Sequence, residues 1–320
     1  MSTNLSRVEK TVEFTLRPIP PFRLDLTVWA LRRRPDNLMD GWDGGTYRRV
    51  LAIGSHPVEV AVTQTGSRDK PHLKIFVIGS QTAAVGTKSE ITLELRRMLG
   101  LQKDLSEFYE FAKRDRKLWE LVDRFRGVKP PRFPTIFEAV VNGIACQQIT
   151  LTQGIRLLNK LAEKYGLTVP LTGGTAFSFP TPAKLARLDP EDLRQLGFTR
   201  QKARAIIELA GGEISKSLDL ESIADLDDQM AVERLMEVRG VGRWTAEYVL
   251  LRGLGRTNVF PGDDVGARNN LTRWLGLSEP LDYKGVLRVI QRFQPYGGLV
   301  YFHLLLSNVV RAGYVSSDGS

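Results

Sequence analysis

Alternating hydrophobic and polar positions predict strands in the first third of the chain. Apolar residues occupy every second position in residues 12–16, 24–28 and 58–62. Two further runs, YRRVLAIG (47–54) and LKIFVIG (73–79), are rich in β-branched and aromatic residues, and each ends at glycine. Period two is typical of half-buried strands, and glycine-containing segments between such runs are typical of turns.

From about residue 87 the apolar positions recur every three to four residues, which predicts helices. The first helix is expected in TKSEITLELRRMLGL, residues 87–101. Later apolar stripes predict helices within residues 105–125, 136–148, 151–166, 179–212, 228–238 and 282–315. The segment 179–212 divides into three short helices capped by Thr181, Asp189 and Thr199, and the last segment divides at 294–298.

Composition narrows the functional classes. The 320 residues are 42% hydrophobic, with no apolar run of the roughly 18 residues that a membrane span needs, and the N-terminus lacks an apolar leader core. We therefore expect a soluble, intracellular protein without membrane association. The single cysteine, Cys146, excludes disulfide frameworks and cysteine-ligated clusters. A net charge of +9 favours a polyanionic partner such as nucleic acid, although a generally basic enzyme has the same property.

The segment LMEVRGVGRWTAEYVLL (235–251) predicts two helices joined by a tight hairpin. We expect Gly240 and Gly242 to permit positive φ and close backbone approach, and the second helix to begin near Gly242 with free amides. Such amides bind phosphate without reading sequence, and Arg239 and Arg243 add charge at the same end. The alternative is an ordinary helix corner with glycine at a C-cap.

Three motifs together resemble the helix-hairpin-helix DNA glycosylase superfamily, of the bacterial 3-methyladenine DNA glycosylase II type. They are VRGVGRWTA (238–246), VFPGDD (259–264) and GIACQQITLTQG (143–154). The resemblance extends from about residue 11 to residue 312. It implies a TATA-binding-protein-like α+β N-terminal domain with an antiparallel sheet, followed by an all-α, two-lobed helix-hairpin-helix core.

The resemblance also implies a division into three domains. Residues 10–100 would form the α+β domain, and residues 137–256 the helical domain with the hairpin. Residues 101–136 and 257–316 would form the second helical domain, which carries the catalytic aspartate. DNA contacts are implied for Arg239, Gly240, Val241, Gly242 and Arg243.

Paired aspartates follow the hairpin by about twenty residues. Asp263 and Asp264 precede a predicted helix, where either could cap the free amides. We expect Asp263 to be the cap, whereas the resemblance implies that Asp264 is catalytic. A fixed carboxylate stabilises the positive charge that develops on deoxyribose as an N-glycosidic bond breaks, and it can orient water.

A base in a duplex must leave the stack to reach such a carboxylate. Trp244 and Tyr248, four residues apart, share a helix face, and the resemblance implies that they line the base pocket together with Tyr296. It places Ile149 as the wedge that fills the vacated stack and Gln148 against neighbouring bases. The alternatives are core aromatics, a buried isoleucine and a capping glutamine.

The implied function is monofunctional hydrolysis of N-alkylated purines such as 3-methyladenine and 7-methylguanine from double-stranded DNA. Lyase-active relatives carry a lysine two residues after the last hairpin glycine, where this chain has Trp244, and residues 217–283 contain no lysine. A bifunctional oxidised-base glycosylase/lyase and a non-enzymatic DNA-binding protein are the alternatives. We expect a monomer that requires no cofactor. The carbonyls of Met236, Val238 and Val241 could hold a structural monovalent or divalent cation, as in relatives.

Overall fold

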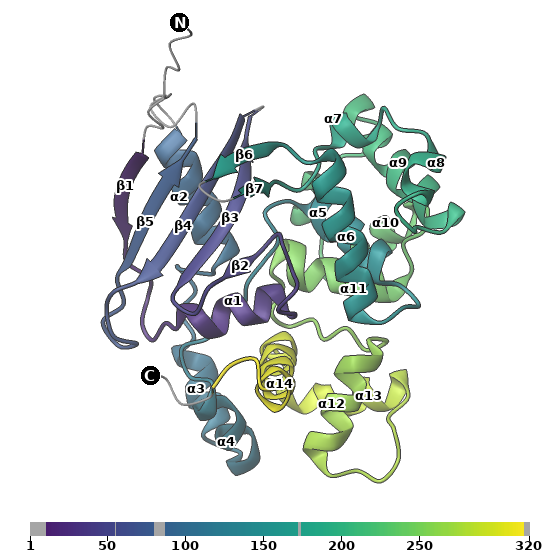
Figure 1. The fold of residues 1–320 in the computed structure, drawn as a ribbon. Coiled ribbons are helices and arrows are strands. Elements are labelled where there is room, and N and C mark those ends of the chain that lie inside the picture. Colours follow the sequence, from purple (N-terminus) through teal and green to yellow (C-terminus); the bar gives the residue numbers. More distant parts are fainter. Residues whose placement is uncertain (1–10, 55, 80–86, 172–173, 317–320) are drawn as a thin grey trace, which may run out of the picture.

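A five-stranded antiparallel sheet forms the N-terminal part of the computed structural model, which describes residues 11–54, 56–79, 87–171 and 174–316 (Figure 1). The strand order is β1-β5-β4-β3-β2. The strands are β1 (Thr11–Leu16), β2 (Gly41–Trp42), β3 (Thr46–Ile53), β4 (His56–Gln64) and β5 (Leu73–Ile78). Strands β1, β3, β4 and β5 confirm four of the five alternating runs.

The remaining run, residues 24–28, lies in a helix, so its prediction as a strand was wrong. Helix α1 (Leu24–Arg32) buries Leu24, Leu26 and every residue from Thr27 to Arg32. Because the helix is buried on nearly all sides, its apolar positions fit a period of two as well as a helical period. The side chain of Thr27 and the chain amide of Thr27 both donate to the Arg23 carbonyl, which fixes the first turn as helical.

Helices make up most of the rest of the described chain and confirm the predicted helical segments. A short ribbon, β6 (Thr168–Leu171) with β7 (Gly174–Phe177), was not predicted because its strands have only four residues and contain Pro170 and Gly174. The helices are α2 (Thr87–Met98), α3 (Ser106–Ala112), α4 (Arg116–Arg124), α5 (Ile136–Cys146), α6 (Leu151–Tyr165), α7 (Pro182–Leu185), α8 (Pro190–Arg194), α9 (Arg200–Ser215), η1 (Glu221–Asp225), α10 (Asp228–Met236), α11 (Arg243–Val249), the π-helix η2 (Leu250–Leu254), α12 (Val265–Leu275), α13 (Tyr283–Ile290), η3 (Gln291–Phe293) and α14 (Gly297–Arg311).

The predicted caps are confirmed. Side chains of Thr181, Asp189 and Thr199 accept backbone amides at the starts of α7, α8 and α9. Thr150 forms a capping box with Gln153 at the start of α6, immediately after the break that the sequence predicted between α5 and α6.

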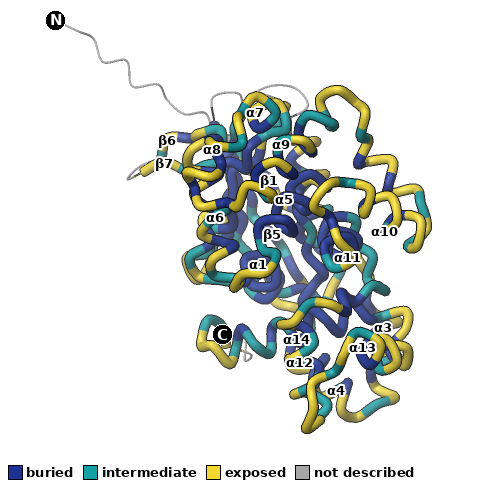
Figure 2. Tube along the Cα trace, turned by 90° about the vertical axis from the view of Figure 1, so that its right-hand side faces the viewer, coloured by how far each residue is buried: buried dark blue, intermediate teal, exposed yellow. Residues whose placement is uncertain are grey.

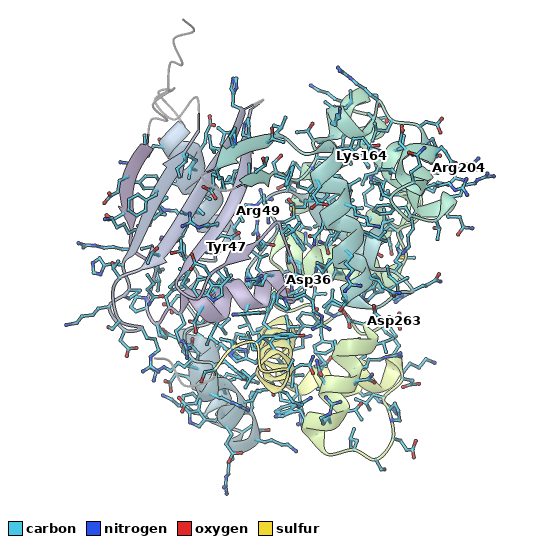
Figure 3. All side chains as sticks on the ribbon, viewed as in Figure 1. Asp36, Tyr47, Arg49, Lys164, Arg204 and Asp263 are labelled. Atoms are coloured by element: carbon cyan, nitrogen blue, oxygen red, sulfur yellow. The ribbon has the colours of Figure 1, made fainter. Side chains whose placement is uncertain are left out.

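A buried ionic cluster joins the sheet to the helices. Arg49 on β3 donates to Asp40 at 2.6 Å and to both carboxylate oxygens of Glu138 on α5, at 2.5 and 2.7 Å. All three side chains are at most 5% exposed. Figure 3 shows Arg49 and Tyr47 between the sheet and the helical part, and Tyr47 donates to Asp40 as well. Removing one partner would leave an uncompensated buried charge, so this cluster fixes the docking of the two parts.

Two hydrophobic clusters form the core, and α1 belongs to both. Leu24, Val28 and Leu31 face the cluster of the sheet and helices α5–α11, whereas Leu26 and Trp29 face that of α3, α4 and α12–α14. Figure 2 shows the buried segments at the centre, around β5 and α5, and exposed ones around α10. The first cluster crosses the predicted boundary at residue 100, and the predicted domain limits stay a prediction.

Within the described ranges, no helix has both the length and the apolar character needed to cross a membrane.

His303 on α14 gives the fold a specific acid sensitivity. Burial lowers its pKa from 6.5 to about 4, its Nδ1 bonds to the Leu299 carbonyl, and its Nε2 has no partner among described residues. The folded pKa lies below the unfolded one, so stability is complete above pH 6.5 and is lost as pH falls toward 4. His303 is therefore a core residue, with 1% of its surface exposed.

We expect His303 to account for a loss of about 2 kcal/mol of unfolding free energy between pH 6.5 and pH 4.5. Urea unfolding of wild type and His303→Gln at the two pH values measures it. The variant should lose that much less stability on acidification. Equal losses in both proteins would show that His303 does not carry this sensitivity.

Candidate active site

The hairpin between α10 and α11 uses its two glycines for different purposes. Gly240 has φ +78°, and a Cβ there would lie 2.8 Å from the Ala205 Cβ on α9. Gly242 is the N-cap of α11 with φ −99°, so the expectation of positive φ there was wrong. A Cβ at Gly242 would meet open space, so glycine keeps the first amides of α11 accessible. Val241 is buried and donates to the Val238 carbonyl, which closes the turn.

The two hairpin arginines are exposed and lie beside these amides. Arg239 pairs with Glu208 at 2.6 Å, and Arg243 stacks over Tyr283 with 5.4 Å to the ring centroid. Exposed pairs of this kind contribute little to stability, so both side chains are available to an anionic partner. Lys202 is not, because its ammonium donates to the carbonyls of Ala145 and Gln147 at the end of α5.

The loop between α5 and α6 is joined directly to the hairpin. The Gln147 amide donates to the Gly240 carbonyl at 2.7 Å and to the Thr245 hydroxyl at 2.8 Å. Gln148 is exposed with φ +55°, a strained conformation for a residue other than glycine. The adjacent Ile149 is 37% exposed, so it is not the buried isoleucine of the alternative interpretation. A polar kink and an exposed apolar side chain therefore lie next to the hairpin turn.

Asp264 begins helix α12, and its two oxygens have different roles. Oδ1 accepts the Ala267 amide at 2.8 Å, so Asp264 is the N-cap, and the expectation that Asp263 caps this helix was wrong. Asp263 is exposed, and Figure 3 shows it between the upper group of helices and the lower group that contains α12 and α13. The second oxygen of Asp264, Oδ2, lies 3.4 Å from the Trp244 indole nitrogen. The cap thus holds one oxygen and directs the other toward Trp244.

A second acid fixes the segment that carries Asp264. Glu247 on α11 is 8% exposed and accepts the Gly262 amide at 2.9 Å and the Tyr283 hydroxyl at 2.7 Å. Burial raises its pKa, and the bonds from Tyr283 and Gly262 oppose that rise. Glu247 could not be recognised from the sequence, because it lies just outside the motif at residues 238–246. It ties the hairpin helix to the loop before Asp264.

The predicted aromatic residues fall into two separate groups. Trp244 and Tyr248 form a pair with ring centroids 5.6 Å apart; Trp244 is half-buried, and Tyr248 is 2% exposed with its hydroxyl on Asn142. Tyr296 instead packs on α3, with its ring 5.3 Å from Phe108 and 5.1 Å from Phe111. The structure therefore brings Trp244 and Tyr248 together with Asp264 and places Tyr296 in contact with another helix.

Tyr301 is the tyrosine of α14 that faces the site. Its side chain is buried, and its pKa is raised well above the usual value by burial first and by the charge of Asp264 second. It lies five residues beyond Tyr296 in an apolar helix, so its sequence context marks it only as core.

Arg33 brings a positive charge to the same site from the N-terminal part. It is 4% exposed, donates to Asn142 at 2.9 Å, lies 5.9 Å from the Tyr248 ring centroid, and leaves Nε without a partner in the described chain. Burial opposes its charge, but Tyr248, Cys146, Tyr301 and Asp264 raise its pKa. Its backbone has φ +62° at the C-cap of α1.

Of those neighbours, only Asp264 is an anion at neutral pH. Burial raises the pKa of Tyr248, Cys146 and Tyr301, so these three groups are uncharged there. Arg33 and Asp264 therefore form a buried cation and an anchored anion on two sides of the aromatic pair. Arg33 could not be recognised from sequence, because it stands in an Arg-Arg-Arg run that is typical of a solvated surface.

No group of three or more His, Cys, Asp or Glu side chains in the described residues is arranged to hold a metal ion. The predicted cation ligands are backbone carbonyls, and that of Val238 already accepts one hydrogen bond within the turn.

Comparison with known proteins identifies the family of the chain. Residues 141–295 match the model of the HhH-GPD superfamily base excision DNA repair proteins. The chain is 30% identical to a Bacillus subtilis DNA-3-methyladenine glycosylase, over 81% of this chain and 84% of that protein. It is 25% identical to Escherichia coli DNA-3-methyladenine glycosylase 2, over 91% and 96%.

Among solved structures, a 3-methyladenine DNA glycosylase from Archaeoglobus fulgidus superposes with a TM-score of 0.78 at 28% identity, covering 93% of this chain and 98% of that one. Sequence, fold and hairpin agree, and the chain belongs to the HhH-GPD superfamily of base excision DNA repair proteins.

Proposed function

We propose that this protein is a monofunctional DNA glycosylase that hydrolyses the N-glycosidic bond of N-alkylated purines in double-stranded DNA. The observation that carries the proposal is the anchored Asp264 carboxylate, with one oxygen on the Ala267 amide and the other toward Trp244. The named relatives, a 3-methyladenine DNA glycosylase of Bacillus subtilis and one of Escherichia coli, support the same reaction class.

DNA is held first by its backbone. The open amides of the hairpin and the exposed Arg239 and Arg243 grip phosphates without reading bases. A cation on the carbonyls of Met236, Val238 and Val241 would strengthen this phosphate binding. The Val238 carbonyl oxygen accepts one hydrogen bond, and its second lone pair could bind the cation. Affinity then falls steeply with salt, because each neutralised phosphate releases counterions.

The target nucleotide then leaves the stack. Ile149, exposed beside the hairpin, fills the gap from the minor groove, and Gln148 contacts neighbouring bases. The everted base lies against Trp244 and Tyr248. Tyr248 is 2% exposed and its ring lies against Trp244, so base entry requires Trp244 to move.

Bond cleavage follows from charge. As the C1′–N bond breaks, its electron pair leaves with the base and positive charge develops on the sugar, which the Asp264 carboxylate stabilises. The carboxylate orients a water that attacks C1′, and the proton that this water loses passes to the Asp264 carboxylate and then to solvent. Products are a free base and an abasic site in an intact strand.

The chain has no lysine at the position where lyase-active relatives carry their nucleophile. Trp244 occupies the lysine position, and Lys202 is engaged at the end of α5. We propose that the protein acts as a monomer on DNA inside the cell and needs no cofactor for hydrolysis.

We expect Asp264→Asn to lower base release at least about a hundredfold, because the charge that stabilises the sugar is lost. Asparagine is an equally good N-cap, so folding and DNA binding should persist. Free bases from methylated DNA, separated by chromatography, and duplex binding are the two measurements. Asp263→Asn, at the exposed neighbour, is the control and should release bases normally. Undiminished release by Asp264→Asn would refute the proposed role, and no release by wild type would favour a pure DNA-binding protein.

We expect Arg33→Gln to raise release of cationic N7-methylguanine relative to neutral hypoxanthine by roughly fivefold, because a buried cation repels a cationic base. Release of the two bases from matched duplexes gives the ratio. Arg34→Gln, at the neighbouring position that bonds to Thr152, should leave the ratio unchanged. An unchanged ratio in Arg33→Gln would place Arg33 outside base selection.

The two hairpin glycines should separate stability from binding. Gly240→Ala should cost about 2 kcal/mol of unfolding free energy, from positive φ and the contact with Ala205. Gly242→Ala should change stability by at most about 1 kcal/mol but weaken duplex binding roughly threefold or more, since its Cβ would stand where phosphate approaches. Denaturant unfolding and fluorescence anisotropy measure the two effects. Wild-type affinity in Gly242→Ala would contradict the assignment.

A further inference from the structure

A second basic feature lies at the carboxyl end of α2. A cavity of about 240 Å³ is bounded by Arg96, Arg97, Gly100, Gln102, Lys103, Pro130, Arg132 and Gly255. We call it the basic cavity. Four of its eight residues are cationic and none is acidic. Its volume is about eight times the ~30 Å³ that one water takes up in the liquid, so it has room for an oxyanion with two or more tetrahedral groups.

The guanidinium donors at the basic cavity are largely unused. Nε and Nη2 of Arg97 and Nε of Arg132 are buried and have no hydrogen-bond partner in the described chain. Among the described residues, the Arg132 guanidinium donates from Nη1 to the Leu254 carbonyl, at 2.8 Å. Buried donors without partners cost free energy, and a ligand with several acceptor oxygens removes that cost.

The charge at this place is also uncompensated. Burial first, and the neighbouring charge of Arg97 second, lower the pKa of Arg132 to about 10. Behind the cavity, Lys129 is fully buried and donates to the Lys103 carbonyl, and burial lowers its pKa to about 8. Like charges brought together in this way oppose one another unless an anion lies between them.

Two carboxylates lie near the basic cavity without pairing with it. Glu94 and Glu221 raise the pKa of Arg132, and Arg97 acts on Glu94, but neither acid forms an ion pair with a cavity residue in the described ranges. Glu94 lines a different cavity, of about 390 Å³, and Glu221 is exposed. Asp104 acts on Lys129 but is held by Ser106.

The basic cavity is distinct from the hairpin. Residues 243–254 form one helical rod through α11 and η2, which begins at the hairpin and ends at Gly255. Twelve residues at 1.5 Å each place the two ends roughly 18 Å apart. Gly255, with φ +78°, also allows the Arg132 side chain to pass, because a Cβ there would lie 2.4 Å from the Arg132 Cδ.

We propose that the basic cavity is a binding site for a phosphate-bearing anion, with Arg97 and Arg132 as the principal donors and Arg96 and Lys103 at its rim. Planar guanidinium groups suit the paired oxygens of phosphate. Two sources supply this chemistry: a free phosphate or diphosphate, or the backbone phosphate of a nucleic-acid strand beyond the part held by the hairpin. The site does not depend on the proposed glycosylase reaction.

Pyrophosphate binding to the full chain, measured by isothermal titration calorimetry at low ionic strength, tests the proposal. We expect saturable binding to wild type and a roughly tenfold weaker Kd in Arg97→Gln, through loss of charge-assisted bonds. Arg97→Lys should recover part of the affinity. Arg116→Gln removes an equal charge from the exposed surface of α4, where Arg116 is 94% exposed, and should bind like wild type.

Absence of pyrophosphate binding, or equal losses in Arg97→Gln and Arg116→Gln, would overturn the proposal, since the second result indicates diffuse surface charge. Duplex binding by the same variants identifies the source. Weaker duplex binding in Arg97→Gln alone supports a strand phosphate, and unchanged duplex binding with weakened pyrophosphate binding supports a free anion. Circular dichroism and thermal unfolding of each variant establish that it is folded.

Discussion

The geometry of the site depends on the fixed orientation of the Asp264 carboxylate, whose two oxygens have different partners. Oδ1 accepts the Ala267 amide of α12, so the carboxylate cannot rotate without losing a helix cap. Oδ2 is therefore directed toward Trp244. Glu247 holds the preceding loop by accepting the Gly262 amide, which ties the position of the carboxylate to the helix that starts at the hairpin. These hydrogen bonds thus link the helix that follows the hairpin to the segment that carries Asp264.

The carboxyl end of α1 gives the N-terminal part a direct share in this site. Arg252 of η2 is fully buried and donates to the last carbonyls of α1, those of Ala30 and Leu31, while its guanidinium lies over Phe133, Tyr248 and Phe302. Arg33 follows immediately and reaches Asn142 and Tyr248. Together with the Arg49 cluster, these contacts hold the N-terminal part against the helices and place the positive charge of Arg33 beside Tyr248.

The sequence predicted most of the fold because its signals are local. Strand alternation, helical stripes and the caps at Thr181, Asp189 and Thr199 depend on neighbouring residues. Helix α1 was not predicted because it is buried on nearly all sides. It therefore lacks the alternation of apolar and polar residues that identifies a surface helix. Trp244, Asp264 and the exposed Ile149 could be identified from motifs. Arg33, Glu247 and Tyr301 could not, because their contacts are with residues far away in the sequence. Tyr296 matched a motif, yet its ring contacts are with α3.

A crystal structure of the Asp264→Asn variant bound to a duplex that contains one N-alkylated purine would test most directly whether Asp264 acts on the sugar of an everted nucleotide. We expect an everted nucleotide with its base against Trp244 and its C1′ about 3.5 Å from the residue 264 side chain or from a water held by it. A target nucleotide that stays stacked in the duplex, or one everted with its C1′ out of reach of residue 264, would refute this role for Asp264.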